Sequence, residues 1–134
     1  MMAGLMRLGR CRTGISAVEL ALVLPLFFAV LLGIINVSLV LWTQASLYFA
    51  VQAAARCAAV NPTTCGSDSA TQAYAASQYY GQVVDGISPP FGPPVQQDCG
   101  RRVSVSYNYP LFIPFYEASP LILSATACFP AQTG

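Results

Sequence analysis

The chain has 134 residues, of which 55% are hydrophobic and only 8% are charged. Soluble domains carry roughly 25% charged residues, so this composition argues against an ordinary soluble globular protein. The net charge is +1 and the chain contains no histidine. The absence of a basic patch argues against nucleic-acid binding, and the absence of histidine removes the commonest general base and metal ligand.

A basic leader precedes a long apolar segment. Residues 1–14 carry arginines and no acidic residue, and after Glu19 the next charged residue is Arg56. A helix needs about 20 apolar residues to cross a bilayer, and residues 20–42 supply that length. The arginines predict a cytoplasmic N-terminus. A cleaved secretory signal is the alternative, but its apolar region would be shorter and would end at a small-residue cleavage site.

The helix is expected to continue beyond the apolar run. Residues 44–60 contain neither Gly nor Pro and are rich in Ala, the best helix former. Asn61-Pro62 should end the helix because the residue before Pro avoids the helical region. We therefore predict one helix over residues 15–60. Its last turns carry a polar stripe, formed by Gln44, Tyr48, Gln52 and Arg56. A stripe of small residues lies roughly opposite and lets another element approach closely; it is formed by Ser46, Ala50, Ala53 and Cys57.

Residues 61–134 are predicted to form a small α+β outer domain. A short helix over 67–80 would be capped by Ser67 or Asp68. Its expected packing face is Ala70, Ala73, Tyr74, Ser77 and Tyr80. The four prolines within 85–98 predict a stiff loop.

Two alternating segments predict a C-terminal antiparallel hairpin, with strands over 102–109 and 121–128. The apolar faces match when Val103 lies across from Leu123 or Ala125, or when the hairpin contains a bulge. Apolar residues gather at the expected tip of the hairpin and would form a partner surface if they were exposed together: Leu111, Phe112, Ile113, Phe115 and Tyr116. Folding back onto the core is the alternative, for these residues and for Phe91.

Four of the five cysteines follow the apolar segment, where disulfides persist, whereas Cys11 precedes it. Four cysteines allow three connectivities. We favour Cys57–Cys65, which closes the turn around Asn61-Pro62, and Cys99–Cys128, which joins the open ends of the hairpin. Cys57 as a small buried residue is the alternative to the first pair. The spacings match no zinc pattern, so we expect neither a metal nor a cofactor.

A glycine and a carboxylate flank the start of the apolar helix. Glu19 lies five residues after Gly14 and about 6 Å from Ile15 along a helix axis. A carboxylate at the centre of a membrane helix costs about 2.5–3.5 kcal/mol on insertion scales, so a positive partner at the same depth is expected. A free amino group on Ile15 would supply it if the chain were cut after Gly14. In an ordinary membrane anchor, Glu19 would instead be an interfacial carboxylate and Gly14 a flexible leader residue.

This arrangement resembles the class III signal of type IV pilins and pseudopilins, in which a basic leader, Gly, four residues and Glu precede a long apolar helix. The match narrows to the TadE-like family of the tight-adherence (Tad) pilus through AVELALVLP at 17–25, GII at 33–35 and AAARCAAV at 53–60. Leu20 departs from the family, which more often has an aromatic residue after the Glu. The resemblance implies a type IV pilin-like α+β fold, prepilin-peptidase cleavage between Gly14 and Ile15, and pairing of Glu19 with an N-terminal amine during assembly.

The resemblance implies a minor pilin or pseudopilin, not an enzyme, in the bacterial inner membrane with its outer domain in the periplasm. It would act in pilus assembly and surface adhesion, with incorporation into the extracellular fibre left open. Implied partners are the prepilin peptidase, other Tad pilins and pseudopilins, and the inner-membrane assembly platform. We expect the helix to pack on other pilin helices through Gly33, Ala50 and Ala53. The alternative function is an unprocessed bitopic anchor that binds a periplasmic partner.

Overall fold

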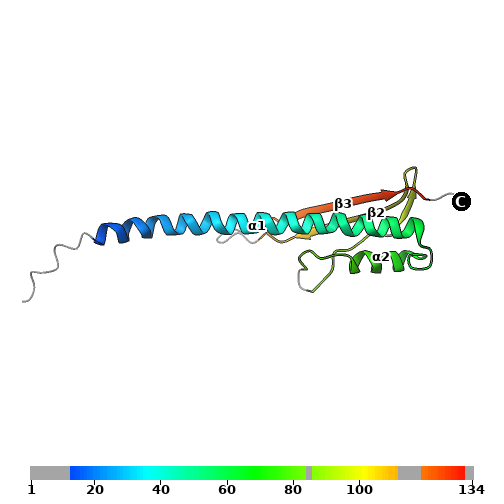
Figure 1. The fold of residues 1–134 in the computed structure, drawn as a ribbon, viewed down its shortest axis with the longest axis horizontal. Coiled ribbons are helices and arrows are strands. Elements are labelled where there is room, and N and C mark those ends of the chain that lie inside the picture. The colour runs from blue at the N-terminus through cyan, green and yellow to red at the C-terminus, as the bar shows by residue number, and fades with distance from the viewer. Residues whose placement is uncertain (1–12, 84–85, 112–118, 132–134) are drawn as a thin grey trace, which may run out of the picture. The chain divides into compact units, whose positions relative to one another are not determined.

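The computed structural model describes residues 13–83, 86–111 and 119–131 (Figure 1). Helices precede strands along the chain, so the predicted α+β fold is confirmed. Contacts divide the chain into two units, one ending at Ile35 and the other beginning at Asn36. The elements, in order, are α1 (Thr13–Val60), α2 (Asp68–Ser77), β1 (Val95–Gln97), β2 (Gly100–Tyr109) and β3 (Leu121–Phe129).

Helix α1 is continuous and contains Pro25. It ends at Val60, as expected from the proline two residues later. The Asn61 N–H donates to the Cys57 carbonyl at 2.8 Å, and the Asn61 side-chain oxygen accepts from the Thr64 N–H at 3.2 Å. These bonds satisfy backbone groups at the end of the helix. The helix begins at Thr13, two residues before the start predicted at Ile15, so the expected cleavage site lies within the first turn.

Helix α2 is shorter than predicted and buries a partly different face. Ser67 is its N-cap, and the Ser67 hydroxyl accepts from the Ala70 N–H at 3.2 Å. The helix ends at Ser77, and its buried residues are Thr71 and Ala75. The predicted face is correct only in part: Ala73, Ser77 and Tyr80 are exposed, whereas Ala70 and Tyr74 are half-buried and Tyr74 packs against the core. A polar residue can occupy the buried face because the Thr71 hydroxyl donates one bifurcated hydrogen bond, shared between the backbone carbonyls of Cys65 and Ser67.

The strands form one antiparallel sheet in the order β1-β2-β3. On β2, Val103, Val105, Tyr107 and Tyr109 are buried and the intervening residues are exposed, as the alternation predicts. Strand β1 was missed because it lies in the segment expected to be a proline-rich loop. It pairs with β2 through a turn that ends at Gly100, whose positive φ of 113° favours glycine.

The predicted register of β2 and β3 was wrong. Val103 pairs with Ala127, rather than with Leu123 or Ala125. The apolar faces still coincide, because the difference from the expected register is an even number of residues. The expected register treated Cys99 and Cys128 as nearly opposite each other at the open ends of the hairpin. In the structure, Cys99 lies in the turn between β1 and β2 and reaches Cys128 from there.

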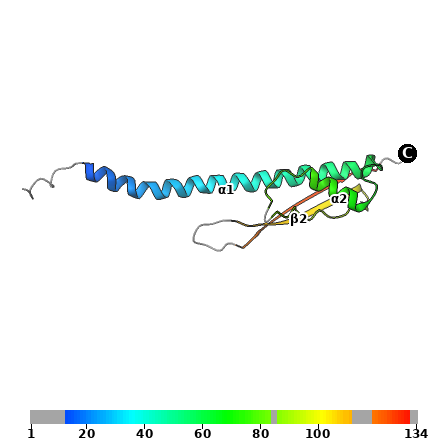
Figure 2. The same ribbon diagram turned by 90° about the horizontal axis from the view of Figure 1, so that it is seen from below.

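The core of the second unit forms where α2 and the sheet pack against the last turns of α1 (Figures 1 and 2). Phe91 is part of this core, so of the two alternatives for this residue, exposure in a partner surface or burial in the core, burial is correct. The centroid of its ring lies 6.3 Å from that of Tyr79, in an edge-to-face arrangement. Fully buried α1 residues include Leu47, Ala50, Val51 and Ala54. The disulfides Cys57–Cys65 and Cys99–Cys128 are formed, with Cα–Cα distances of 5.8 and 6.1 Å.

Candidate functional site

The segment with the proposed processing motif lies in the first turns of α1. Gly14, Ile15 and Glu19 are all helical. Glu19 is therefore about one helical turn from Ile15 along the axis, and its side chain is exposed. From Thr13 to Ala55 it is the sole charged residue in the sequence. A carboxylate in this position has no oppositely charged residue on its own stretch of helix to neutralise it.

The following turns of α1 are apolar on all sides. Most large hydrophobic side chains from Val18 to Trp42 are exposed, with Leu22 at 75% and Leu26 at 67%. A helix that is hydrophobic all round is either a buried core helix or a membrane span. This one is long and apolar enough to cross a membrane, and its most apolar stretch is not buried in the protein. Its surface is therefore suited to lipid or to other apolar helices.

The last turns of α1 place the two predicted stripes on opposite sides. Tyr48, Gln52 and Arg56 are exposed, whereas Ser46, Ala50 and Cys57 are buried. The expected packing of other pilin helices on Ala50 is therefore wrong, because Ala50 is fully buried against this chain's own domain. Ala53 is half-buried at the edge of that contact. The small side chains serve the internal approach of α2 and the sheet.

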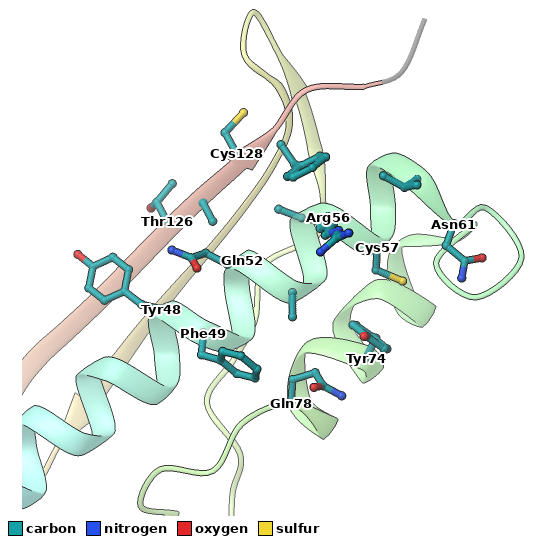
Figure 3. Close-up of a pocket in the computed structure, with 15 residues that line it drawn as sticks. Tyr48, Phe49, Gln52, Arg56, Cys57, Asn61, Tyr74, Gln78, Thr126 and Cys128 are labelled. Atoms are coloured by element: carbon teal, nitrogen blue, oxygen red, sulfur yellow. The ribbon is translucent and has the colours of Figure 1, made fainter. Parts of the chain in front are cut away.

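The exposed stripe forms the floor of a groove of about 930 Å³ (Figure 3). Strand β3 borders the groove through Thr126, Ala127, Cys128 and Phe129. On the other side of α1, Tyr74 of α2 and the C-cap residue Gln78 border it. In Figure 3 the side chains of Gln52 and Arg56 lie over the helix, between these two walls. The groove is open to solvent and lined by both polar and apolar side chains. It is therefore better suited to bind a polypeptide than a small molecule, which usually binds in a more enclosed and more apolar pocket.

A hydrogen-bonded cluster fixes the segment after α2 to α1. The Tyr79 hydroxyl donates to the Gln82 carbonyl at 2.6 Å, and the Tyr80 N–H donates to the Ser46 hydroxyl at 2.7 Å. Burial raises the pKa of Tyr79 to about 12, and the neighbouring Tyr107 and Tyr109 add to this effect. A phenol held neutral in this way is a structural donor at physiological pH, since it can keep its proton and its hydrogen bond.

Other predicted site residues fall outside the described part of the chain. Phe112, Ile113, Phe115 and Tyr116 of the candidate partner surface lie there, whereas Leu111 is half-buried and packs against the core. Within the described ranges, no three His, Cys, Asp or Glu side chains form a metal-binding group. The groove was not predicted as a site. Its polar stripe was visible in the sequence at four-residue spacing, but its β3 wall depends on the sheet register.

The structure thus combines a long apolar N-terminal helix with a short helix and an antiparallel sheet, which is an α+β pilin-like fold. Residues 14–56 match the family model of the TadE-like protein family, so the resemblance inferred from the sequence is confirmed over this segment. The matched segment is therefore similar to a family of pilin-like proteins associated with Tad pili, which is a structural rather than an enzymatic class. Comparison with curated proteins and with solved structures gives no match.

Proposed function

We propose that this chain is a minor pilin or pseudopilin of a Tad pilus. The observation that carries the proposal is the coincidence of two features: the TadE-like match covers residues 14–56, and most of that segment, residues 18–42, is an apolar stretch of helix with a largely exposed surface. The helix spans the bacterial inner membrane, the basic leader lies in the cytoplasm, and residues 61–134 lie in the periplasm. The protein acts in pilus assembly and surface adhesion and catalyses no reaction.

Processing by a prepilin peptidase between Gly14 and Ile15 creates the assembly-competent chain. The family match begins at Gly14, which supports this position for the cut. Cleavage releases a positive amino group on Ile15, about 6 Å along the axis from Glu19. In a membrane, pairing of the Glu19 carboxylate with such an amine, its own or a neighbour's, offsets the cost of burying either charge. This pairing fixes the axial position of one subunit against the next.

Helix packing within the membrane involves Gly33 rather than the buried Ala50. A Cβ added at Gly33 meets nothing within 4 Å in this chain, so the position is open to a neighbouring helix. Ala29 lies four residues earlier, which gives the small-xxx-small spacing that lets membrane helices approach closely. The outer domain then contacts sister subunits and the inner-membrane assembly platform.

The decisive experiment compares the intact mass and N-terminal sequence of the protein from cells with and without the prepilin peptidase. We expect a chain that begins at Ile15 only when the peptidase is present. A full-length chain in both strains would overturn the proposal and leave an unprocessed bitopic anchor that binds a periplasmic partner.

A variant pair separates cleavage from assembly. Glu19→Gln removes the charge but keeps the shape of the side chain, so we expect normal cleavage and loss of pilus assembly. Ser16→Ala changes an exposed neighbour and should leave both intact. Equal assembly by Glu19→Gln and the unmodified chain would contradict the proposed charge pairing.

A further inference from the structure

The free edge of β3 presents unpaired backbone groups. The Gly92 N–H donates to the Ser104 carbonyl at 2.8 Å, so Ser104 directs its backbone bonds away from β3. Thr126 lies directly opposite Ser104. Ser104 and Thr126 therefore form a non-hydrogen-bonded pair of the antiparallel ladder, in which the backbone N–H and C=O of both residues point away from the partner strand. Thr126 thus directs its N–H and C=O toward the outer edge of β3. The same alternation applies to Ser124 and Cys128, on either side of Thr126.

A second contact confirms this direction and shows where the edge is open. The Gln44 side-chain amide donates to the Ser124 carbonyl at 2.8 Å, from α1 across to the outer edge of β3. Within the described residues, no comparable bond reaches the backbone of Thr126 or Cys128 on this edge. Gln44 therefore occupies the edge at Ser124, and the edge is vacant from there to the end of the strand.

This edge lacks the usual protection against strand pairing. Exposed edge strands commonly carry charged side chains, internal prolines or bulges. The segment LILSATACF contains no charge and no proline, and its pairing with β2 is regular over the whole strand. Prolines occur only at the flanking positions Pro120 and Pro130. The part of this edge beyond Ser124, residues 125–129, is therefore a template for a short added strand.

The exposed stripe of α1 has the spacing of a strand. Tyr48, Gln52 and Arg56 are four residues apart, which corresponds to about 6 Å along the helix axis. Alternate residues of a strand are about 6.8 Å apart. Strand β3 runs alongside this part of α1 in both views (Figures 1 and 2). A strand added to β3 would therefore cover the groove and place alternate side chains over the stripe.

The chemistry of the stripe selects the added strand. Arg56 is exposed and no ion pair engages it within the described residues, and Gln52 offers both an amide donor and an acceptor. Carboxylates at alternate positions would complement Arg56 with a charge-assisted hydrogen bond. Strand β3 of a second copy supplies no carboxylate and would bring two arginine-bearing stripes together.

From these observations we propose that β3 and the α1 stripe bind an extended segment of a different polypeptide as a fourth strand. The segment carries carboxylate side chains at alternate positions, and these side chains face Gln52 and Arg56. Backbone bonds to Thr126 and Cys128 provide affinity, and the stripe provides selectivity, as in other cases of strand addition. This site does not depend on processing at Gly14 or on the proposed pilus function.

The test uses the full-length oxidised chain in detergent micelles and the capped peptide (Thr-Glu)3-Thr as the probe. Amide NMR signals report on the edge residue by residue. We expect the signals of Thr126 and Cys128 to shift on addition of peptide, and their hydrogen exchange to slow by about tenfold or more. The same peptide with every backbone amide N-methylated cannot pair with the edge and should have no effect. No shift of these two signals at the solubility limit of the probe would overturn the proposal.

Variants separate the backbone from the charge contribution. Arg56→Gln should lower the affinity for (Thr-Glu)3-Thr by about threefold or more, to the affinity of the uncharged peptide (Thr-Gln)3-Thr. The affinity for (Thr-Gln)3-Thr itself should not change. Thr126→Pro removes one edge N–H and should weaken both peptides, whereas Thr126→Val keeps the N–H and should weaken neither. Slow, concentration-dependent exchange of Thr126 and Cys128 without any peptide would show that a second copy occupies the edge, and would overturn the choice of partner.

Discussion

The side-chain amide of Gln44 lies 2.8 Å from the backbone carbonyl oxygen of Ser124 and donates a hydrogen bond to it. The two residues are 80 positions apart. This bond ties the outer edge of β3 to α1 and marks the point beyond which that edge is free. It also joins the second unit's last strand to the helix that the family match covers.

Replacing Gln44 by Ala should loosen β3 against α1. The change removes one solvent-exposed hydrogen bond, so we expect a loss of about 0.5 kcal/mol in the free energy of unfolding, at the low end of the usual range. Urea denaturation of the chain in detergent micelles, followed by near-ultraviolet circular dichroism, measures it. Gln52→Ala alters an exposed glutamine on the same stripe and is the control. Equal stability of the two variants would show that the bond contributes nothing.

Enlarging Ala50 should disrupt the domain, because its side chain is fully buried beneath the sheet and α2. We expect Ala50→Leu to lower the free energy of unfolding by about 1–3 kcal/mol through overpacking. Ala45 is exposed on the same helix, and Ala45→Leu should change stability by less than about 0.5 kcal/mol. Thermal unfolding of the two variants distinguishes them. If Ala50→Leu did not lower the stability, Ala50 would not be packed inside the domain, and this face of α1 could again be a packing surface for other helices.

The two disulfides should differ in their contribution to stability. They join residues 8 and 29 positions apart. In the chain-entropy model, closing these loops stabilises by about 2.5 and about 3.5 kcal/mol, respectively. We therefore expect the double variant of Cys99 and Cys128 to Ala to be less stable than that of Cys57 and Cys65. Chemical denaturation of both double variants gives the order, and the reverse order would mean that native-state contacts outweigh loop entropy.

Gly100 should tolerate no side chain. Its φ is 113°, and a Cβ there would collide with the carbonyl oxygen of Phe129. We expect Gly100→Ala to cost about 2 kcal/mol or more, because both the backbone conformation and the contact are unfavourable. Gly86→Ala is the control: its φ is also positive, but a Cβ there meets nothing within 4 Å. That variant should cost only about 1 kcal/mol. Similar losses in both would exclude the collision as a cause.

The domain should lose stability at alkaline pH because of Tyr79. Its pKa is raised from 10.0 to about 12 in the folded chain. Its stabilising contribution is complete below pH 10 and is lost as the pH rises toward 12, because the unfolded chain releases this proton first. Urea midpoints across this range should fall more steeply for the unmodified chain than for Tyr79→Phe. Both proteins should carry Cys11→Ser, which prevents thiol exchange at high pH, and parallel slopes would contradict the assignment.

The sequence by itself determined the elements whose signals are local. The uncharged run from Leu20 to Ala55 specified the apolar helix, since bilayer thickness and helix rise fix the required length. Asn61-Pro62 specified its end, and alternation specified β2 and β3. The pairing of Cys57 with Cys65 followed from their proximity around a turn, and the TadE-like segment was recognisable from its residues alone.

Only the tertiary structure decided which surfaces remain available. Ala50 is small and lies on a helix face, but its burial depends on α2 and a sheet that come later in the chain. The buried position of Thr71 depends on carbonyl oxygens that the loop from Cys65 supplies. The register of β3 depends on how the turn at Cys99 meets Cys128, so the free edge beside Arg56 could not be located from periodicity. Local patterns determine elements, whereas register, facing and exposure arise from contacts between residues distant in sequence.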